Sequence, residues 1–135
     1  MDYSIAICDD EDRERDYIAG LCQQWCRAGG HTLALRQFSS AEEFLFADHD
    51  AANFDILLLD IEMGKMDGVQ LAKRIRKQNE TVQIIFVTGY SDYISEGYEV
   101  AALHYLMKPV QQEKFFSVLD RAAKMLRKNE RTLTV

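Results

Sequence analysis

The sequence is poor in cysteine and proline, and it has no long apolar run. Its 135 residues include three cysteines and one proline, and a low, odd number of cysteines is typical of free thiols in a reducing compartment. No apolar stretch approaches the roughly 18 residues that a membrane-spanning helix needs. The N-terminus, MDYSIAICDDED, lacks the basic segment that begins a signal peptide. We therefore expect a cytoplasmic protein with no membrane partner.

The chain also lacks an excess of positive charge. Its net charge is −6, whereas a nucleic-acid-binding protein needs a basic face that displaces counterions. Basic residues do cluster in AKRIRKQ (72–78) and between residues 121 and 128, but both clusters lie in helical patterns and are typical of a solvated helix face. DNA would therefore be a partner only through a domain absent from this chain.

Short apolar runs alternate with amphipathic segments along the whole chain, without internal repeats or a linker of low complexity. The pattern predicts strands at 3–8, 31–38, 54–59, 82–88 and 103–108, and helices at 12–27, 39–46, 67–79, 91–102 and 111–129. Ser40 with Glu43 forms a predicted capping box, and Asp67 is a predicted N-cap. Strands and helices in this order favour an α/β fold in which helices cover both faces of a parallel sheet.

The end of the sequence, RTLTV (131–135), alternates with a period of two. Two interpretations stay open: a frayed terminus, or the first strand of a further domain that this chain lacks. We accordingly divide the chain into one domain over residues 1–128 and a tail over residues 129–135.

Chemically distinctive residues follow four of the five predicted strands. They are Asp9 and Asp10 after the first strand, Asp60 after the third, Thr88 at the end of the fourth and Lys108 at the end of the fifth. Ligands of open α/β sheets bind at the carboxyl ends of the strands, near the point where the strand order reverses. If the first strand lies between the second and the third, these side chains come together.

Three carboxylates in one place repel one another unless a cation offsets their charge. Mg²⁺ suits such a site, because it binds few carboxylates, keeps several waters and usually shares phosphate oxygens. A hydroxyl and an ammonium group nearby would stabilise a phosphoryl group. The strand ends therefore indicate Mg²⁺-assisted phosphoryl chemistry with Asp60 as the nucleophile.

The same residues carry a family resemblance. AICDDED, DILLLDIEMGKMDG, FVTGY and HYLMKP, in that order, resemble the receiver domain of two-component response regulators over about residues 3–128. The resemblance implies a flavodoxin-like (βα)5 fold, a doubly wound parallel five-stranded sheet with strand order 2-1-3-4-5. It also implies a signalling phosphoprotein rather than an enzyme with an external substrate.

The resemblance assigns the acceptor and the metal site. Asp60 would accept a phosphoryl group from the phosphohistidine of a sensor histidine kinase, forming an aspartyl phosphate. Asp10 would bind Mg²⁺ directly, Asp9 would hold it mainly through water, and Asp60 would share it. The backbone carbonyl of Glu62 would complete the protein ligands.

The resemblance also assigns the residues that respond to phosphorylation. Lys108 would pair with a phosphoryl oxygen, and a cis peptide bond would join it to Pro109. Thr88 would hydrogen-bond the phosphoryl group, and Tyr105 matches an aromatic residue that moves from exposed to buried. The fourth helix, fifth strand and fifth helix would form the readout face, through which a homodimer could assemble.

One departure and one narrower similarity accompany this assignment. The family often has proline four residues after the acceptor, where this chain has Gly64, so we expect a more flexible loop there. The segment GYSDYISEGYEVAALHYLMKPV (89–110) is similar to receivers that precede a LytTR-type DNA-binding domain. In that family a strand follows the last receiver helix, which would explain RTLTV as a truncation point.

Three functions fit the sequence. The first is the switch of a transcription regulator whose DNA-binding half is absent, and the second is a stand-alone receiver that binds a protein or stores phosphate. The third is a Mg²⁺-dependent phosphohydrolase of haloacid-dehalogenase type, but that family has a second aspartate where this chain has Glu62. Cys8, Cys22 and Cys26 are interpreted as small core residues rather than metal or redox groups.

Overall fold

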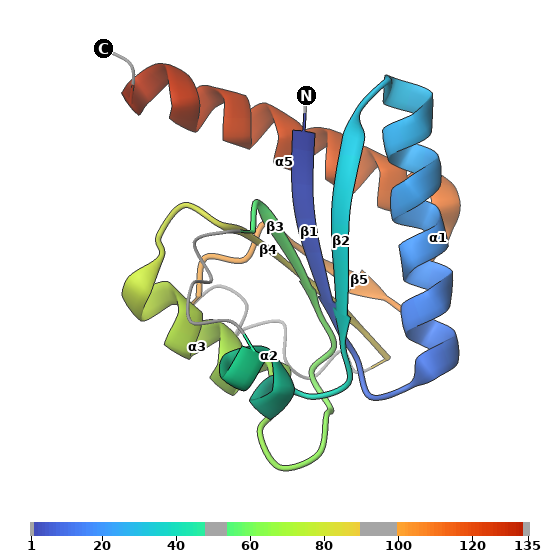
Figure 1. Ribbon diagram of the computed structural model, residues 1–135, viewed down its shortest axis with the longest axis vertical. Coiled ribbons are helices and arrows are strands. Elements are labelled where there is room, and N and C mark those ends of the chain that lie inside the picture. The colour runs from blue at the N-terminus through green and yellow to red at the C-terminus, as the bar shows by residue number, and fades with distance from the viewer. Residues whose placement is uncertain (1, 48–53, 90–99, 134–135) are drawn as a thin grey trace.

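The computed structural model describes residues 2–47, 54–89 and 100–133 (Figure 1). The strands are β1 (Asp2–Cys8), β2 (Thr32–Phe38), β3 (Ile56–Leu59), β4 (Gln83–Thr88) and β5 (His104–Met107). The helices are α1 (Asp12–Gly29), α2 (Ala41–Ala47), α3 (Gly68–Gln78) and α5 (Gln112–Leu133). The helix predicted at 91–102 falls almost wholly on residues 90–99, which lie outside the described residues.

All five strands are parallel and form one sheet in the order β2-β1-β3-β4-β5, as predicted. Every residue of β3 and β4 is buried, because helices cover both faces of these central strands. β2 instead alternates between exposed and half-buried residues along most of its length, as an edge strand with one solvated face should. The predicted doubly wound α/β architecture is confirmed.

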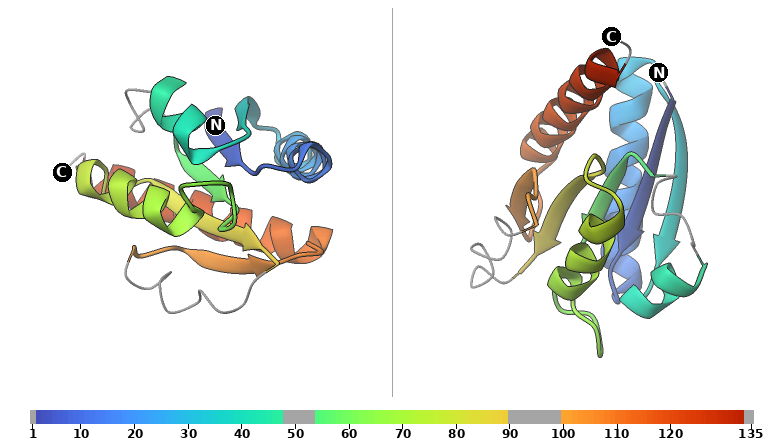
Figure 2. Two further views of the ribbon diagram at one scale, coloured as in Figure 1. Left: turned by 90° about the horizontal axis from the view of Figure 1, so that it is seen from below. Right: turned by 90° about the vertical axis from the view of Figure 1, so that its left-hand side faces the viewer.

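Two apolar clusters cover the two faces of the sheet. One contains α1 and α5 with side chains such as Ile7, Trp25 and Phe115, and the other contains α2 and α3 with side chains such as Phe44, Leu57 and Ile75. Figures 1 and 2 show these helix pairs on opposite sides of the strands. All three cysteines are free and buried, and burial raises the pKa of each thiol, so they behave as core residues.

The helix caps follow the predictions with one difference. Asp67 caps α3 by accepting a hydrogen bond from the backbone N–H of Gln70 at 2.8 Å, and the Gln70 side chain accepts from the N–H of Asp67 at 3.0 Å. At α2, the Ser40 hydroxyl accepts from the Glu43 N–H at 3.0 Å. The Glu43 carboxylate, however, accepts from the Ser39 hydroxyl at 2.5 Å and not from the Ser40 backbone N–H. Only one of the two hydrogen bonds of the predicted capping box is therefore formed.

The last helix is longer than predicted. α5 extends to Leu133, so residues 131–133 are helical in this chain and the interpretation of RTLTV as a strand is wrong for them. No glycine or proline follows Asn129 to end the helix. Whether the natural chain continues into a further domain stays a prediction. Among the described residues, no helix combines the length and the apolar character that crossing a membrane requires.

The segment that precedes β5 is held by a side chain from α3. Arg76 donates from Nε to the carbonyl oxygen of Val100 at 2.6 Å and from Nη2 to that of Ala101 at 3.2 Å. Leu103 then donates its N–H to the Ile84 carbonyl of β4 at 2.7 Å. These bonds position the chain as it enters β5, whose pairing with β4 then sets the position of the lysine that follows it.

Candidate functional site

The carboxyl ends of β1 and β3 bring the predicted aspartates together. Cys8 pairs with Leu59 across these strands, and the N–H of Asp60 donates to the Cys8 carbonyl at 2.9 Å. Asp9 and Asp60 therefore leave the sheet side by side. Carboxylate oxygens of Asp9, Asp10 and Asp60 all lie within 4.8 Å of one another. Asp9 and Asp60 are buried, whereas Asp10 is exposed.

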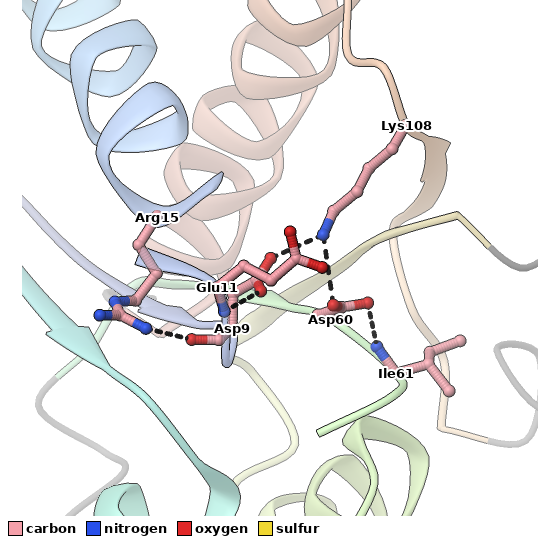
Figure 3. A network of polar contacts seen from close by, with 6 residues as sticks. All are labelled: Asp9, Glu11, Arg15, Asp60, Ile61 and Lys108. Carbon is pink, nitrogen blue, oxygen red and sulfur yellow. Dashed lines mark hydrogen bonds and ion pairs between the residues drawn. The ribbon is translucent and has the colours of Figure 1, made fainter. Parts of the chain in front are cut away.

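Lys108 reaches this cluster from the far side of β4. Its backbone N–H donates to the Thr88 carbonyl at 2.8 Å, which places the side chain at the end of β5. Its Nζ atom lies 2.7 Å from Oδ2 of Asp9 and 3.2 Å from Oδ2 of Asp60 (Figure 3). The two buried carboxylates thus share one ammonium group, which offsets part of the cost of burying their charge.

Asp60 is held by three kinds of donor. One carboxylate oxygen accepts the N–H of Ile61 at 2.8 Å, the other accepts Nζ of Lys108, and the Thr88 side chain hydrogen-bonds the same carboxyl group. Burial and the nearby Asp9 raise the pKa of Asp60, and the contacts with Lys108 and Thr88 offset part of that rise. The Asp60 carboxylate is therefore oriented by its donors and poorly solvated.

The charge of Lys108 is stabilised by the same contacts. Burial alone would lower the pKa of its ammonium group, but the hydrogen bond to Asp9 and the charges of both aspartates outweigh that effect and raise it. Lys108 is accordingly a cation at neutral pH, in the position where a hydrogen-bond donor to an added phosphoryl oxygen would be useful.

The first residue of α3, Gly68, comes close to the Asp60 backbone. A Cβ atom placed on Gly68 would lie 2.1 Å from the Asp60 carbonyl oxygen, and the Gly68 N–H donates to the Ile61 carbonyl at 2.7 Å. Gly64, where the family resemblance would lead us to expect proline, has φ of 61°. Proline is fixed near −65° and cannot adopt that backbone. The greater flexibility expected of the loop from β3 to α3 stays a prediction.

Replacing Gly68 with alanine should destabilise the fold and displace Asp60. The added methyl group would overlap backbone atoms rather than a flexible side chain, and overpacking of this kind costs about 1–3 kcal/mol. Gly20→Ala is the matched control, because a Cβ atom there has no neighbour within 4 Å and Gly20 lies inside α1. Alanine at that position should stabilise by up to about 1 kcal/mol. Urea unfolding of both variants measures the difference; equal stabilities would contradict the close approach.

The remaining predicted residues surround this centre. The peptide bond between Lys108 and Pro109 is cis, as predicted. Tyr105 is half-buried, with its ring centroid 6.0 Å from that of Phe86. Glu62 is exposed beside a pocket of about 680 Å³ next to the aspartates. The pocket is lined by Asp10, Glu11, Asp60, Glu62, Met63, Gly64, Lys65, Asp67, Gly89 and Lys108.

Sequence reasoning did not identify three contributors to the site. The N–H of Ile61 binds the Asp60 carboxylate. Glu11 donates its backbone N–H to Asp9 at 2.9 Å, and its side chain points toward the side of the site where Lys108 lies (Figure 3). Arg15 binds the backbone carbonyl of Asp9. Two of these contacts use backbone donors, which every residue except proline has, so residue types gave no signal for them.

The donor set fits a small divalent cation. Three carboxylates within 4.8 Å of one another, two of them buried, offer the hard oxygen ligands that Mg²⁺ prefers. The ammonium group of Lys108 offsets only part of their charge, so negative charge remains in excess. Asp9, Asp10 and Asp60 would hold the ion beside the open pocket, where waters and phosphate oxygens could complete its ligands.

Comparisons with known proteins agree with this geometry. The response regulator receiver domain family matches residues 5–120. The positive alginate biosynthesis regulatory protein of Pseudomonas aeruginosa is 33% identical over 90% of this chain and 47% of its own length. The sensory transduction protein LytT of Bacillus subtilis is 31% identical over 91% of this chain and 49% of its own. The chain thus spans about half the length of these relatives.

Solved structures share the fold. The response regulatory domain of protein mrkE from Klebsiella pneumoniae is 23% identical with a TM-score of 0.81, over 93% of this chain and 98% of that one. The response regulator TrrA from Thermotoga maritima, solved in complex with Mg²⁺-BeF, is 27% identical with a TM-score of 0.72. That match covers 89% of this chain and 98% of that one.

Proposed function

This chain belongs to the response regulator receiver domain family, and we propose that it is a signalling switch whose Asp60 accepts a phosphoryl group from a sensor histidine kinase. The two relatives, one of them named LytT, agree with the predicted LytTR-type subfamily. One observation supports the assignment of Asp60 above all others. Lys108, at the end of β5, bridges the buried carboxylates of Asp9 and Asp60, which follow β1 and β3.

The residues around Asp60 fit an in-line transfer to its carboxylate. An oxygen of Asp60 would form the new bond to phosphorus as the bond from phosphorus to the donor nitrogen breaks. The Ile61 N–H orients the carboxylate, and Lys108 and Thr88 stand ready to bind phosphoryl oxygens. Mg²⁺, held by Asp9, Asp10, Asp60 and the Glu62 carbonyl, would stabilise the charge that develops on the transferred group. TrrA, with its Mg²⁺-BeF complex, supports a site of this kind.

The added charge provides the switch. An aspartyl phosphate carries about −1.5 to −2 charges by analogy with other phosphorylated residues, in place of the single negative charge of the carboxylate, and Lys108 and Thr88 are its nearest predicted partners. Thr88 ends β4, which pairs with β5, and β5 contains Tyr105. Phosphorylation would then shift a pre-existing equilibrium of β4, β5 and α5, together with the helix predicted at 91–102.

The output would be transcription through a LytTR-type DNA-binding domain. The relatives are about twice as long as this chain, which supports a further domain, and their names describe regulatory and sensory transduction proteins. A homodimer through the face formed by β5, α5 and the helix predicted at 91–102 is a second element of the proposal. A stand-alone receiver that acts by protein binding is the alternative. The buried free cysteines agree with the proposed cytoplasmic location.

Acetyl phosphate tests the proposed chemistry directly. With Mg²⁺ it should add one phosphoryl group to the intact protein, and a chelator should prevent the reaction. Intact-mass spectrometry measures the adduct. Repeated turnover of assorted phosphate esters would instead favour a phosphohydrolase. A protein that gains no phosphoryl group at any Mg²⁺ concentration would contradict the proposed phosphoacceptor role.

Asp10→Asn should weaken Mg²⁺ binding by at least about tenfold. Loss of even an outer partner of a metal ligand commonly costs 10- to 100-fold in affinity, and Asp10 is proposed as a direct ligand. Asp16→Asn is the control, because it removes an exposed acidic group from α1 outside the cluster. Isothermal titration calorimetry with Mg²⁺ compares the two. Equal affinities would exclude Asp10 as a ligand.

A further inference from the structure

Arg15 makes a contact that the proposed chemistry does not use. Its Nη1 atom donates to the backbone carbonyl oxygen of Asp9 at 2.6 Å. Its Nη2 atom pairs with the carboxylate of Asp12, one turn earlier on α1. Only 13% of the Arg15 side chain is exposed, whereas 85% of the Asp12 side chain is. In Figure 3 the Arg15 guanidinium lies on the opposite side of Asp9 from Lys108.

This contact acts on the peptide unit that links two proposed metal ligands. A peptide unit is planar, so the direction of the Asp9 carbonyl also sets the direction of the Asp10 N–H and the path to its Cα atom. The other polar groups of Asp9 are already held. Its N–H donates to Phe38 at 3.1 Å, one carboxylate oxygen accepts from the Glu11 N–H, and the other accepts from Lys108.

The Asp10 side chain has no hydrogen bonds comparable to those of Asp9 among the described residues. It is exposed, and within the described part of the chain its carboxylate forms no hydrogen bond or ion pair. The direction in which this carboxylate leaves the backbone therefore depends on the peptide unit before it. Without the Arg15 contact, that peptide unit could rotate and carry Asp10 away from Asp9 and Asp60.

We propose that Arg15 is a positioning residue that sets the affinity for Mg²⁺ by holding the peptide unit between Asp9 and Asp10. The inference rests on the proposed function, because it takes the three aspartates as the metal site. Arg15 acts through the backbone of Asp9, and Asp12 orients the guanidinium group. A ligand held in place before the ion arrives loses less conformational freedom on binding, which raises affinity.

Electrostatics alone predicts the opposite result. The guanidinium is a positive charge near a cation site, so its removal should strengthen Mg²⁺ binding if charge were its only influence. The positioning role predicts weaker binding. The sign of the change therefore separates the two explanations.

Arg15→Met and Arg13→Met form the test pair, because each removes one arginine charge from the start of α1. Arg13 is exposed and has no contact with the Asp9 carbonyl. Arg15→Met should weaken Mg²⁺ binding by about tenfold, near the lower end of what loss of an outer partner costs, while Arg13→Met should change it by less than about twofold. Calorimetric titration of each variant with MgCl₂ measures the affinities.

Phosphorylation and a second pair of variants complete the experiment. Arg13→Met should reach the same adduct level with acetyl phosphate as the unmodified protein at every Mg²⁺ concentration, whereas Arg15→Met should need a higher Mg²⁺ concentration to reach it. If Arg15→Met fails to fold, Asp12→Ala takes its place. Asp16→Ala is then the control for the lost negative charge, and Asp12→Ala should bind Mg²⁺ more weakly than Asp16→Ala. The inference would be overturned if Arg15→Met bound Mg²⁺ as tightly as its control. The same result for Asp12→Ala would overturn it where Arg15→Met does not fold. Undiminished binding by Asp10→Asn would instead exclude Asp10 as a ligand, and with it the premise on which the inference rests.

Discussion

Asp60→Asn is expected to abolish the phosphoryl adduct that acetyl phosphate and Mg²⁺ form on the unmodified protein. Asparagine keeps the size of the side chain but replaces the attacking carboxylate with an amide, which is not a comparable nucleophile. The hydrogen bond from the Ile61 N–H can be retained by the amide oxygen, so the loop should keep its geometry. Intact-mass spectrometry under acidic, cold conditions measures the adduct, and the expected change is complete loss.

Asp67→Asn is the matched control for this substitution. Asp67 lines the same pocket, but its carboxylate caps α3, and asparagine is an equally good N-cap. This variant should therefore fold normally and form the adduct to the same extent as the unmodified protein. An unchanged mass increment in Asp60→Asn would refute the assignment of Asp60, and its loss in both variants would show that the pocket rather than one carboxylate is required.

The strand-end argument predicted the centre of the site because it depends on topology alone. Once β1 lies between β2 and β3, the residues after Cys8 and Leu59 must be neighbours. The residue after β5 must then reach across β4, and the long side chain of Lys108 can do so. Hydrophobic patterning located these strands, because central strands buried on both faces are the strongest signals in such a sequence. Their order in the sheet was implied only by the family resemblance.

Other features of the site could not be read from residue types. The close approach of Gly68 to the Asp60 carbonyl and the bond from Arg15 to the Asp9 carbonyl both involve backbone atoms. Backbone groups are the same in nearly every residue, so their partners depend on loop conformation. The end of α5 was mispredicted for a related reason. The alternation in RTLTV is too short to outweigh a helix that meets no stop signal.

Lys108→Met should destabilise the Mg²⁺-free protein by about 3–5 kcal/mol, which is the usual cost of leaving a buried charge without its partner. Asp9 and Asp60 are 4% and 6% exposed, and both contact the Lys108 ammonium. Methionine preserves most of the apolar stem but removes the charge. Lys65→Met is the control, since Lys65 is an exposed lysine beside the same pocket and should change stability by less than about 0.5 kcal/mol. Urea unfolding in the presence of a chelator measures both.

Two conditions should reduce the loss of stability caused by Lys108→Met. Both act on the buried carboxylates of Asp9 and Asp60, which the substitution leaves without their cation. Mg²⁺ should restore stability by binding the folded state, by about 2.7 kcal/mol at 100 times its dissociation constant. Acid should restore it as well. Burial and Asp9 already raise the pKa of Asp60, and loss of Lys108 removes an influence that lowers it. The folded state then takes up a proton at a pH where the unfolded state does not, so the stability of the variant rises as pH falls through the pKa of Asp60. A variant as stable as Lys65→Met at neutral pH without Mg²⁺ would contradict the ion pairs on which the proposed site depends.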